Sequence, residues 1–223
     1  MKLSLLLLTL VMINAPVTSA GELASQWETR LDEDNILVES RKIQNASYDE
    51  FRATMIVSTG LAPAIALLQD TSACSDWIFR CKESAIIEAF SKTERTFYQV
   101  TTLPFPAKAR DVIFHAEITF LPNGAIRVSM TARPNALPET KHVRVREAYG
   151  AYTLTPLAEG KTRVIWEQYV DPAGRLPAWL VNSMLTDLPY KSLKRFRQKV
   201  MTAPYNAAGF VYDDNNNPVG INF

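Results

Sequence analysis

Few residues of this chain could do covalent or metal chemistry. The two cysteines, Cys74 and Cys81, lie close together, and the two histidines, His115 and His142, stand far from them. No pair among the four has the ligand spacing of a metal site. The sequence contains no Gly-x-Ser-x-Gly elbow, no His-Glu-x-x-His pair, no phosphate-binding glycine loop and no dinucleotide fingerprint. We therefore expect no catalytic residue, no metal and no cofactor.

The histidines leave one catalytic alternative open. His115 falls on the less apolar face of a predicted strand and His142 lies at a loop end. Either ring could act as a general base. A surface or hydrogen-bonded histidine is the commoner situation.

The N-terminus predicts export. Lys2 precedes an apolar run over 3–13, and small residues occupy 18–20. This is the layout of a secretory signal peptide, and the run is shorter than the ~20 residues of a membrane-spanning helix. We expect cleavage after Ala20, a signal peptide over 1–20 and a periplasmic or secreted protein. The alternative is an uncleaved N-terminal anchor.

Export changes the expected state of the cysteines. An oxidising compartment allows Cys74 and Cys81 to form a disulfide. Two buried thiols are the alternative.

The overall charge argues against a nucleic-acid partner. Lys and Arg total 24 against 23 Asp and Glu among 223 residues, a formal charge of +1. A basic excess, which non-specific nucleic-acid binding requires, is absent. The 47% hydrophobic content is that of an ordinary globular domain.

These residues must be positioned by an α+β fold, because consecutive strands are not separated by helices. Alternation of Val112, Phe114, Ala116 and Ile118 with more polar residues predicts a strand with one buried face. A capping-box spacing, Ser25 to Glu28, predicts a first helix over 23–34. Further helices are predicted over 61–70 and 177–201, and strands over 36–43, 49–58, 78–90, 94–103, 110–121, 125–133, 143–155 and 161–171. Residues 203–223 are expected to be an irregular tail.

The ordered motifs of the chain resemble the START (steroidogenic acute regulatory protein-related lipid transfer) domain. They are Trp77, the Pro-Phe-Pro of 104–106 followed by Arg110-Asp111, Val143-Arg144, the run 152–156 with Gly160, and the run 171–182. The resemblance implies a helix-grip fold over 21–202. In that fold a curved antiparallel sheet of about nine strands wraps around a long C-terminal helix and leaves a tunnel for one lipid or other apolar small molecule.

If the tunnel exists, its walls should be the inward-facing side chains of the sheet and the last helix. For each of them, plain core is the commoner situation and a ligand wall is the alternative. The expected lipid-binding set is Phe114, Ala116, Ile118, Val128, Met130, Tyr149, Trp166, Met184 and Leu188.

A gate is expected where the loop 133–141 meets the last helix. The loop carries Leu137 and Pro138, and an interior Pro189 predicts a kink in the helix. A simple connector is the alternative for the loop. Five basic residues near the helix end are read as a solvated face or as a transient contact with anionic membranes; these are Lys191, Lys194, Arg195, Arg197 and Lys199.

Three functions remain open at this point. The first is an exported lipid-binding or lipid-transfer protein. The second is an interaction module that uses the same fold without a lipid. The third is a cyclase-like or hydrolase-like enzyme acting on an apolar substrate, for which His115 or Glu117 would be required.

Overall fold

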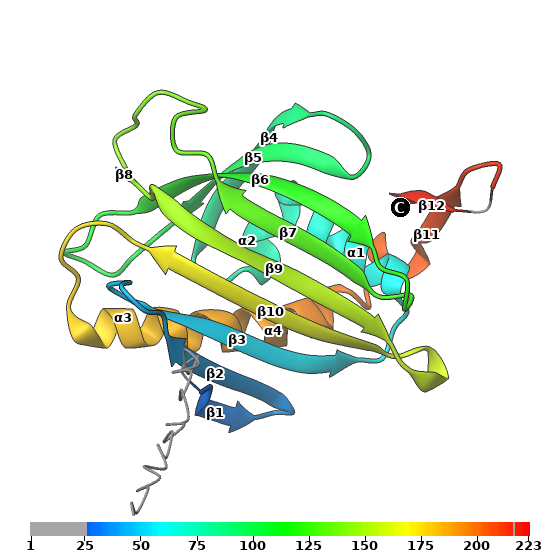
Figure 1. Ribbon diagram of the computed structural model, residues 1–223, viewed down its shortest axis with the longest axis horizontal. Helices are drawn as coiled ribbons and strands as arrows, with labels where there is room; N and C mark the ends of the chain where they lie inside the picture. The colour runs from blue at the N-terminus through cyan, green and yellow to red at the C-terminus, as the bar shows by residue number, and fades with distance from the viewer. Residues whose placement is uncertain (1–25, 216) are drawn as a thin grey trace, which may run out of the picture.

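A computed structural model of the protein describes residues 26–215 and 217–223. The predicted signal peptide, 1–20, lies outside the described residues. Within the described chain, a ten-stranded sheet has the order β1-β2-β3-β10-β9-β7-β6-β5-β4, and β8 pairs in parallel with β6 (Figure 1). Its strands are β1 (Glu28–Glu33), β2 (Ile36–Lys42), β3 (Asp49–Val57), β4 (Cys81–Ala89), β5 (Glu94–Thr101), β6 (Arg110–Phe120), β7 (Ile126–Ala132), β8 (Val143–Arg144), β9 (Glu147–Pro156) and β10 (Thr162–Asp171).

Four α-helices and three 3₁₀ helices are seen in the described residues. Between β3 and β4 lie α1, η1 and α2, whereas α3 and α4 follow β10. The helices are α1 (Leu61–Gln69), η1 (Thr71–Ala73), α2 (Cys74–Trp77), η2 (Ala158–Gly160), α3 (Ala178–Leu185), α4 (Asp187–Lys199) and η3 (Tyr205–Ala207). Two further strands, β11 (Gly209–Tyr212) and β12 (Pro218–Asn222), form a separate hairpin.

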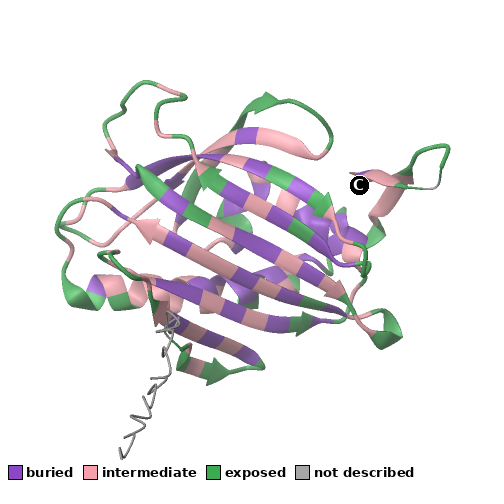
Figure 2. Ribbon diagram, in the orientation of Figure 1, coloured by how far each residue is buried: buried purple, intermediate pink, exposed green. Residues whose placement is uncertain are grey.

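The sheet curves around α4, which gives the predicted helix-grip architecture (Figure 1). Leu193, Phe196 and Val200 draw an apolar stripe along this helix end and are fully buried. On the sheet side, burial alternates along the strands, as the banding in Figure 2 shows. The alternation supplies one apolar face for the helices to cover.

Most predicted strands are confirmed to within a few residues. The strand predicted over 78–90 begins later, at Cys81, because 74–77 form α2. The strand predicted over 143–155 is divided into β8 and β9. The helix predicted over 61–70 is α1.

The first predicted helix, 23–34, is wrong in its described part, which forms β1 and the turn into β2. Asp34 and Asn35 both have positive φ, 53° and 56°. Two successive residues with positive φ make the turn that matches the twist of a tight hairpin. The hairpin buries Ile36 and Val38 in the core, and this burial outweighs a local helix-start pattern.

The C-terminal helix is broken at Thr186 and not kinked at Pro189. Thr186 has φ −119°, and it separates α3 from α4. Pro189 becomes the third residue of α4, where a backbone N–H would have no partner within the helix. A new helix start therefore accommodates the proline at lower cost than an interior kink.

The segment 203–223 is not an irregular tail in its described part. It contains η3 and the β11–β12 hairpin. Tyr205 is buried and its hydroxyl donates to Asp70 Oδ2 at 2.6 Å. Phe210 contacts Phe120 at a centroid distance of 6.3 Å. Apolar side chains spaced among the Asn and Asp residues thus fix this segment beside α1.

Candidate functional site

An internal cavity of about 160 Å³ lies between the concave face of the sheet and the helices. Its walls come from β3, β5, β6, β7, β9 and β10 on one side and from α2, α3 and the start of α4 on the other. The lining is mostly apolar. A volume of this order holds a small ring or part of a chain, so a larger ligand requires movement of a wall.

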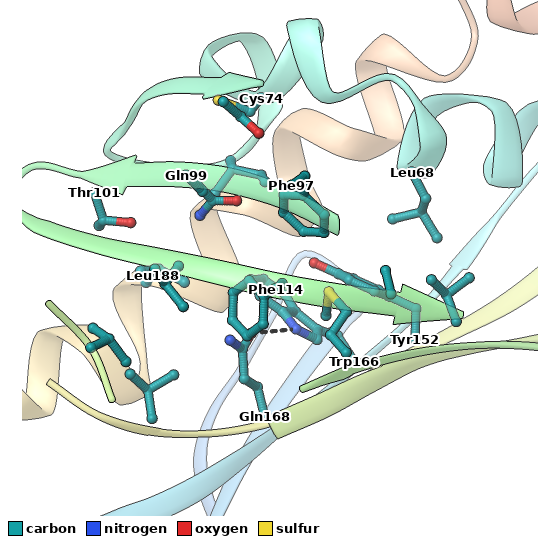
Figure 3. A pocket seen from close by; sticks show the side chains of 18 of the residues that line it. Leu68, Cys74, Phe97, Gln99, Thr101, Phe114, Tyr152, Trp166, Gln168 and Leu188 are labelled. Atoms are coloured by element: carbon teal, nitrogen blue, oxygen red, sulfur yellow. Dashed lines mark hydrogen bonds between the residues drawn. The ribbon is translucent and has the colours of Figure 1, made fainter. Parts of the chain in front are cut away.

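The structure brings eight of the nine predicted wall residues to this cavity. Tyr149 does not line it: its side chain is 41% exposed and stacks on Tyr169 on the outer face of the sheet. Tyr152, three positions along β9, points inward in its place (Figure 3). The eight residues at the cavity are Phe114, Ala116, Ile118, Val128, Met130, Trp166, Met184 and Leu188.

Aromatic residues that sequence reasoning missed shape the middle of the cavity. Tyr152 stacks on Trp166 at 5.0 Å between ring centroids, and Trp77 meets Tyr152 edge-on at 6.2 Å. Phe97 packs against Phe114 at 5.7 Å. Alternation along β9 was the available signal for Tyr152, because Ala148 and Leu154 on the same face are also buried.

The polar groups in the middle of the cavity are uncharged. Gln168 accepts a hydrogen bond at its Oε1 from Trp166 Nε1 at 2.9 Å. Gln99 and Thr101 extend from β5 toward the same space (Figure 3). These side chains offer hydrogen bonds without adding a formal charge.

Two arginines line the ends of the cavity and bond to backbone carbonyls. Arg110, 7% exposed, donates from Nε to Pro172 O at 2.9 Å and from Nη2 to Ala173 O at 2.9 Å. Arg95 Nη1 donates to Gln69 O at 3.0 Å. Burial lowers the pKa of both guanidinium groups. Arg110 thereby connects β6 to the segment that leads into α3.

The predicted gate loop, 133–141, is fastened to the sheet. Arg144 donates to the carbonyls of Pro134 at 2.6 Å, Leu137 at 3.2 Å and Pro138 at 3.0 Å. Neither Leu137 nor Pro138 lines the cavity. Thr140 also donates to Asp111 Oδ2 at 2.8 Å. This loop is therefore a poor candidate for a moving part.

The helix α4 is also fastened, through the β1–β2 turn. Asp34 Oδ2 accepts hydrogen bonds from Tyr190 at 2.7 Å and Lys194 at 2.6 Å, and Arg197 donates to Asp34 O at 2.8 Å. Hydrogen bonds from Lys194 and Tyr190 lower the pKa of Asp34. By contrast, α3 buries only Leu180.

The predicted basic face of α4 is largely occupied by partners within the protein. Lys191 lies 3.3 Å from Asp187, and Lys199 lies 2.7 Å from Asp76. Arg195 lies over the Phe79 ring at 5.3 Å. Lys194 and Arg197 bond to Asp34 in the β1–β2 turn. Most of the positive charge of this face is therefore paired or hydrogen-bonded within the protein.

The predicted disulfide is present and closes α2 onto β4. Cys74 and Cys81 are bonded, with their Cα atoms 5.9 Å apart, and Cys74 lines the cavity. His115 is distant from this lining: its Nε2 lies 3.3 Å from Glu94 Oε1, and its ring faces Phe90. Neither His115, His142 nor Glu117 reaches the cavity.

A curved antiparallel sheet that wraps around a helix and leaves an apolar cavity between the two layers is the helix-grip architecture. The START domain family model matches residues 12–203, and the chain belongs to this family. No helix of the described residues is long and apolar enough to cross a membrane.

The chain is similar to one curated protein sequence and to several solved structures. An uncharacterized protein of Pseudomonas aeruginosa is 28% identical over 180 residues, which cover 80% of this chain and 89% of that protein. A STAR-related lipid transfer protein from Xanthomonas axonopodis is 28% identical with TM-score 0.73, covering 79% of this chain and 99% of that one. Human STARD10 shares the fold at 19% identity and TM-score 0.69, covering 83% and 76%.

Proposed function

We propose that the protein is an exported carrier that holds one lipid or other apolar small molecule in the cavity between the sheet and α3–α4. The observation that carries this proposal is a mostly apolar cavity lined from both layers of the fold. Burial of ligand surface there would be favourable by about 25 cal/mol per Å² of apolar area. Membership of the START family supports the same function.

Export is supported by two independent features. The N-terminal sequence has the layout of a signal peptide. The Cys74–Cys81 disulfide requires an oxidising compartment to persist. Both features favour the periplasm or the extracellular space.

The proposed gate is α3, turning about Thr186. Val181, Met184 and Leu185 of α3 line the cavity, yet only Leu180 of this helix is buried. The hydrogen bonds of α4 to the β1–β2 turn, and of Arg144 to the loop 133–141, hold these two segments in place. We therefore propose α3 as the moving part, in place of the loop 133–141 with Leu137 and Pro138.

The loop 102–109 and α3 both contribute residues to the cavity lining. Leu103 of this loop lines the cavity. Phe105 is 93% exposed, and Trp179 at the start of α3 is 56% exposed. Two exposed aromatic side chains on segments bordering one opening suit a transient contact with a membrane surface, where aromatic rings are favoured.

Native mass spectrometry of the purified mature protein, with extraction of any bound lipid, tests the function. We expect one apolar molecule per chain. A protein that carries no molecule and takes up none from mixed vesicles would instead support an interaction module on the same fold. Turnover of an apolar substrate that is lost in His115→Ala would support the enzyme alternative.

A further inference from the structure

The cavity contains a hydroxyl group without a protein partner. Tyr152 is 4% exposed, and its ring is held between Trp166 and Trp77. Its hydroxyl lies on the cavity side of β9 (Figure 3). It makes no hydrogen bond to any of the residues 26–215 or 217–223. The hydroxyl therefore borders the cavity, where an acceptor on a ligand could bind it.

A second donor lies beside it on the neighbouring strand. Trp166 and Tyr152 are paired residues of β10 and β9, and Gln168 follows Trp166 on the same face. The Trp166 indole N–H can only donate, so the Gln168 atom that bonds it must be the carbonyl oxygen. The amide NH₂ of Gln168 is thereby turned away from Trp166, toward Phe114 in Figure 3. This leaves its N–H groups as donors to the cavity.

The charged groups around the cavity are already engaged. Arg110 and Arg95 donate to backbone carbonyls. Asp70 accepts from Tyr205 and Ser72, and Asp49 lies 3.5 Å from Arg30. Because a backbone carbonyl is neutral, both arginines keep their charge, whereas Tyr152 Oη and the Gln168 amide are uncharged hydrogen-bond donors.

We propose that the ligand is an uncharged apolar molecule carrying a hydrogen-bond acceptor, such as a ketone or ester carbonyl oxygen, that is bound by Tyr152 Oη and Gln168 Nε2. The proposal rests on the lipid-binding function proposed above. A carbonyl oxygen satisfies these donors and brings no charge to desolvate. A carboxylate would pay the full cost of burying a charge, whereas an alkane would leave the donors unpaired.

The protonation state of Tyr152 suits this role. Burial raises the pKa of its phenol well above the ordinary value. The hydroxyl therefore keeps its proton at physiological pH and remains a donor.

The test compares three probes of equal chain length: dodecane, 2-dodecanone and dodecanoate at neutral pH. Each displaces the neutral fluorophore N-phenyl-1-naphthylamine from the purified mature protein. We expect the ketone to bind about three- to tenfold more tightly than dodecane, the range for one or more net hydrogen bonds. Dodecanoate should bind more weakly than the ketone.

Two variants assign the preference to the named atoms. Tyr152→Phe keeps the ring stack and removes only the hydroxyl, whereas Gln168→Met keeps a side chain of similar length and removes the amide donors. Each should reduce the preference for the ketone over dodecane about two- to fivefold. Tyr149→Phe, on the outer face of the same strand, is the matched control and should not change this preference.

Equal binding of ketone and dodecane, or a ketone preference that survives both variants, would overturn the proposal while the lipid-binding function stands. Tighter binding of dodecanoate than of the ketone would overturn it in favour of an anionic ligand. Failure of the fluorophore and all three probes to bind would contradict the proposed function itself.

Discussion

Arg144 and Asp111 form a bidentate ion pair that is almost completely shielded from solvent. Nε lies 3.1 Å from Oδ1 and Nη2 lies 3.0 Å from Oδ2, with side-chain exposures of 1% and 0%. Because Arg144 also holds three carbonyls of the loop 133–141, this pair joins β6, β8 and that loop. Its role is structural, and it lies outside the cavity lining.

Asp111→Asn should lower the free energy of unfolding by about 3–5 kcal/mol, because it leaves the Arg144 charge buried and unpaired. Denaturant unfolding measures this loss. Glu139→Gln, which breaks the exposed pair with Arg146, is the matched control and should have little effect. Equal small effects of both substitutions would refute a special contribution of the buried pair.

The same carboxylate should make stability fall in acid. Burial alone would raise the pKa of Asp111, but hydrogen bonds from Arg144 and Thr140 outweigh it and hold the pKa below its ordinary value. Its contribution is therefore complete above the unfolded pKa of about 3.9 and is lost as pH falls through the folded pKa. Unfolding measured across this acid range should show a shallower pH dependence in Asp111→Asn than in the wild type.

Met130→Trp should fill the cavity and reduce ligand uptake per folded molecule at least severalfold. Overpacking costs about 1–3 kcal/mol, so the variant should still fold. Met184→Trp on α3 should act in the same way, because both methionines line the cavity. Thr131→Trp places the same ring on the exposed face of β7 and is the control. Unchanged uptake in both methionine variants would mean that these side chains are ordinary core.

The native protein should contain no free thiol when titrated under denaturing, non-reducing conditions. Replacing Cys74 and Cys81 by serine together should lower the free energy of unfolding by about 2–3 kcal/mol, the loop-entropy value for so short a ring. Two reactive thiols in the unreduced protein would contradict the bond.

Tyr205→Phe should release the C-terminal segment from α1. Burial and the hydrogen bond to Asp70 raise the pKa of Tyr205, so the hydroxyl stays a donor at neutral pH. Proteolysis of native protein should cut within 206–223 faster in the variant, because the bond to Asp70 is lost. Tyr212→Phe, at an exposed position, should leave the cleavage rate unchanged. Equal rates in both variants would show that other contacts hold the segment.

Amide hydrogen exchange should separate the two C-terminal helices. We expect α3 to exchange faster than α4, because α4 carries the bonds to Asp34 and the buried stripe of Leu193 and Phe196. Ligand should slow exchange in α3 selectively. A uniform response along 178–199 would argue against a hinge at Thr186.

The sequence was sufficient for most of the sheet, because alternation is a local property. The alternation of buried and more polar residues is clear in β6, over 112–118, and in its partner strand β7. The same alternation predicted most of the cavity wall. Tyr149 was misplaced because Tyr149 and Tyr152 are both aromatic on one strand. The alternation of Ala148, Tyr152 and Leu154 places Tyr152 on the inward face, where it pairs with Trp166 of β10.

Other features depend on contacts distant in the sequence. Ser25 to Glu28 has a helix-start spacing, yet the burial of Ile36 and Val38 favours a hairpin. The Gln168 carbonyl oxygen is occupied because the Trp166 N–H donates to it. The direction of that N–H cannot be predicted from the spacing of the two residues. The anchoring of the loop 133–141 likewise follows from Arg144 being buried beside Asp111.

The hydrogen bonds between the β1–β2 turn and α4 join a segment that is synthesised early with one that is synthesised late. Asp34 meets Tyr190, Lys194 and Arg197 across sequence separations of 156 to 163 residues. The first hairpin consequently cannot reach its final packing until nearly the whole polypeptide has emerged. Such long-range closure slows folding, so the N-terminal part of the chain stays without its final contacts for longer after it has been made.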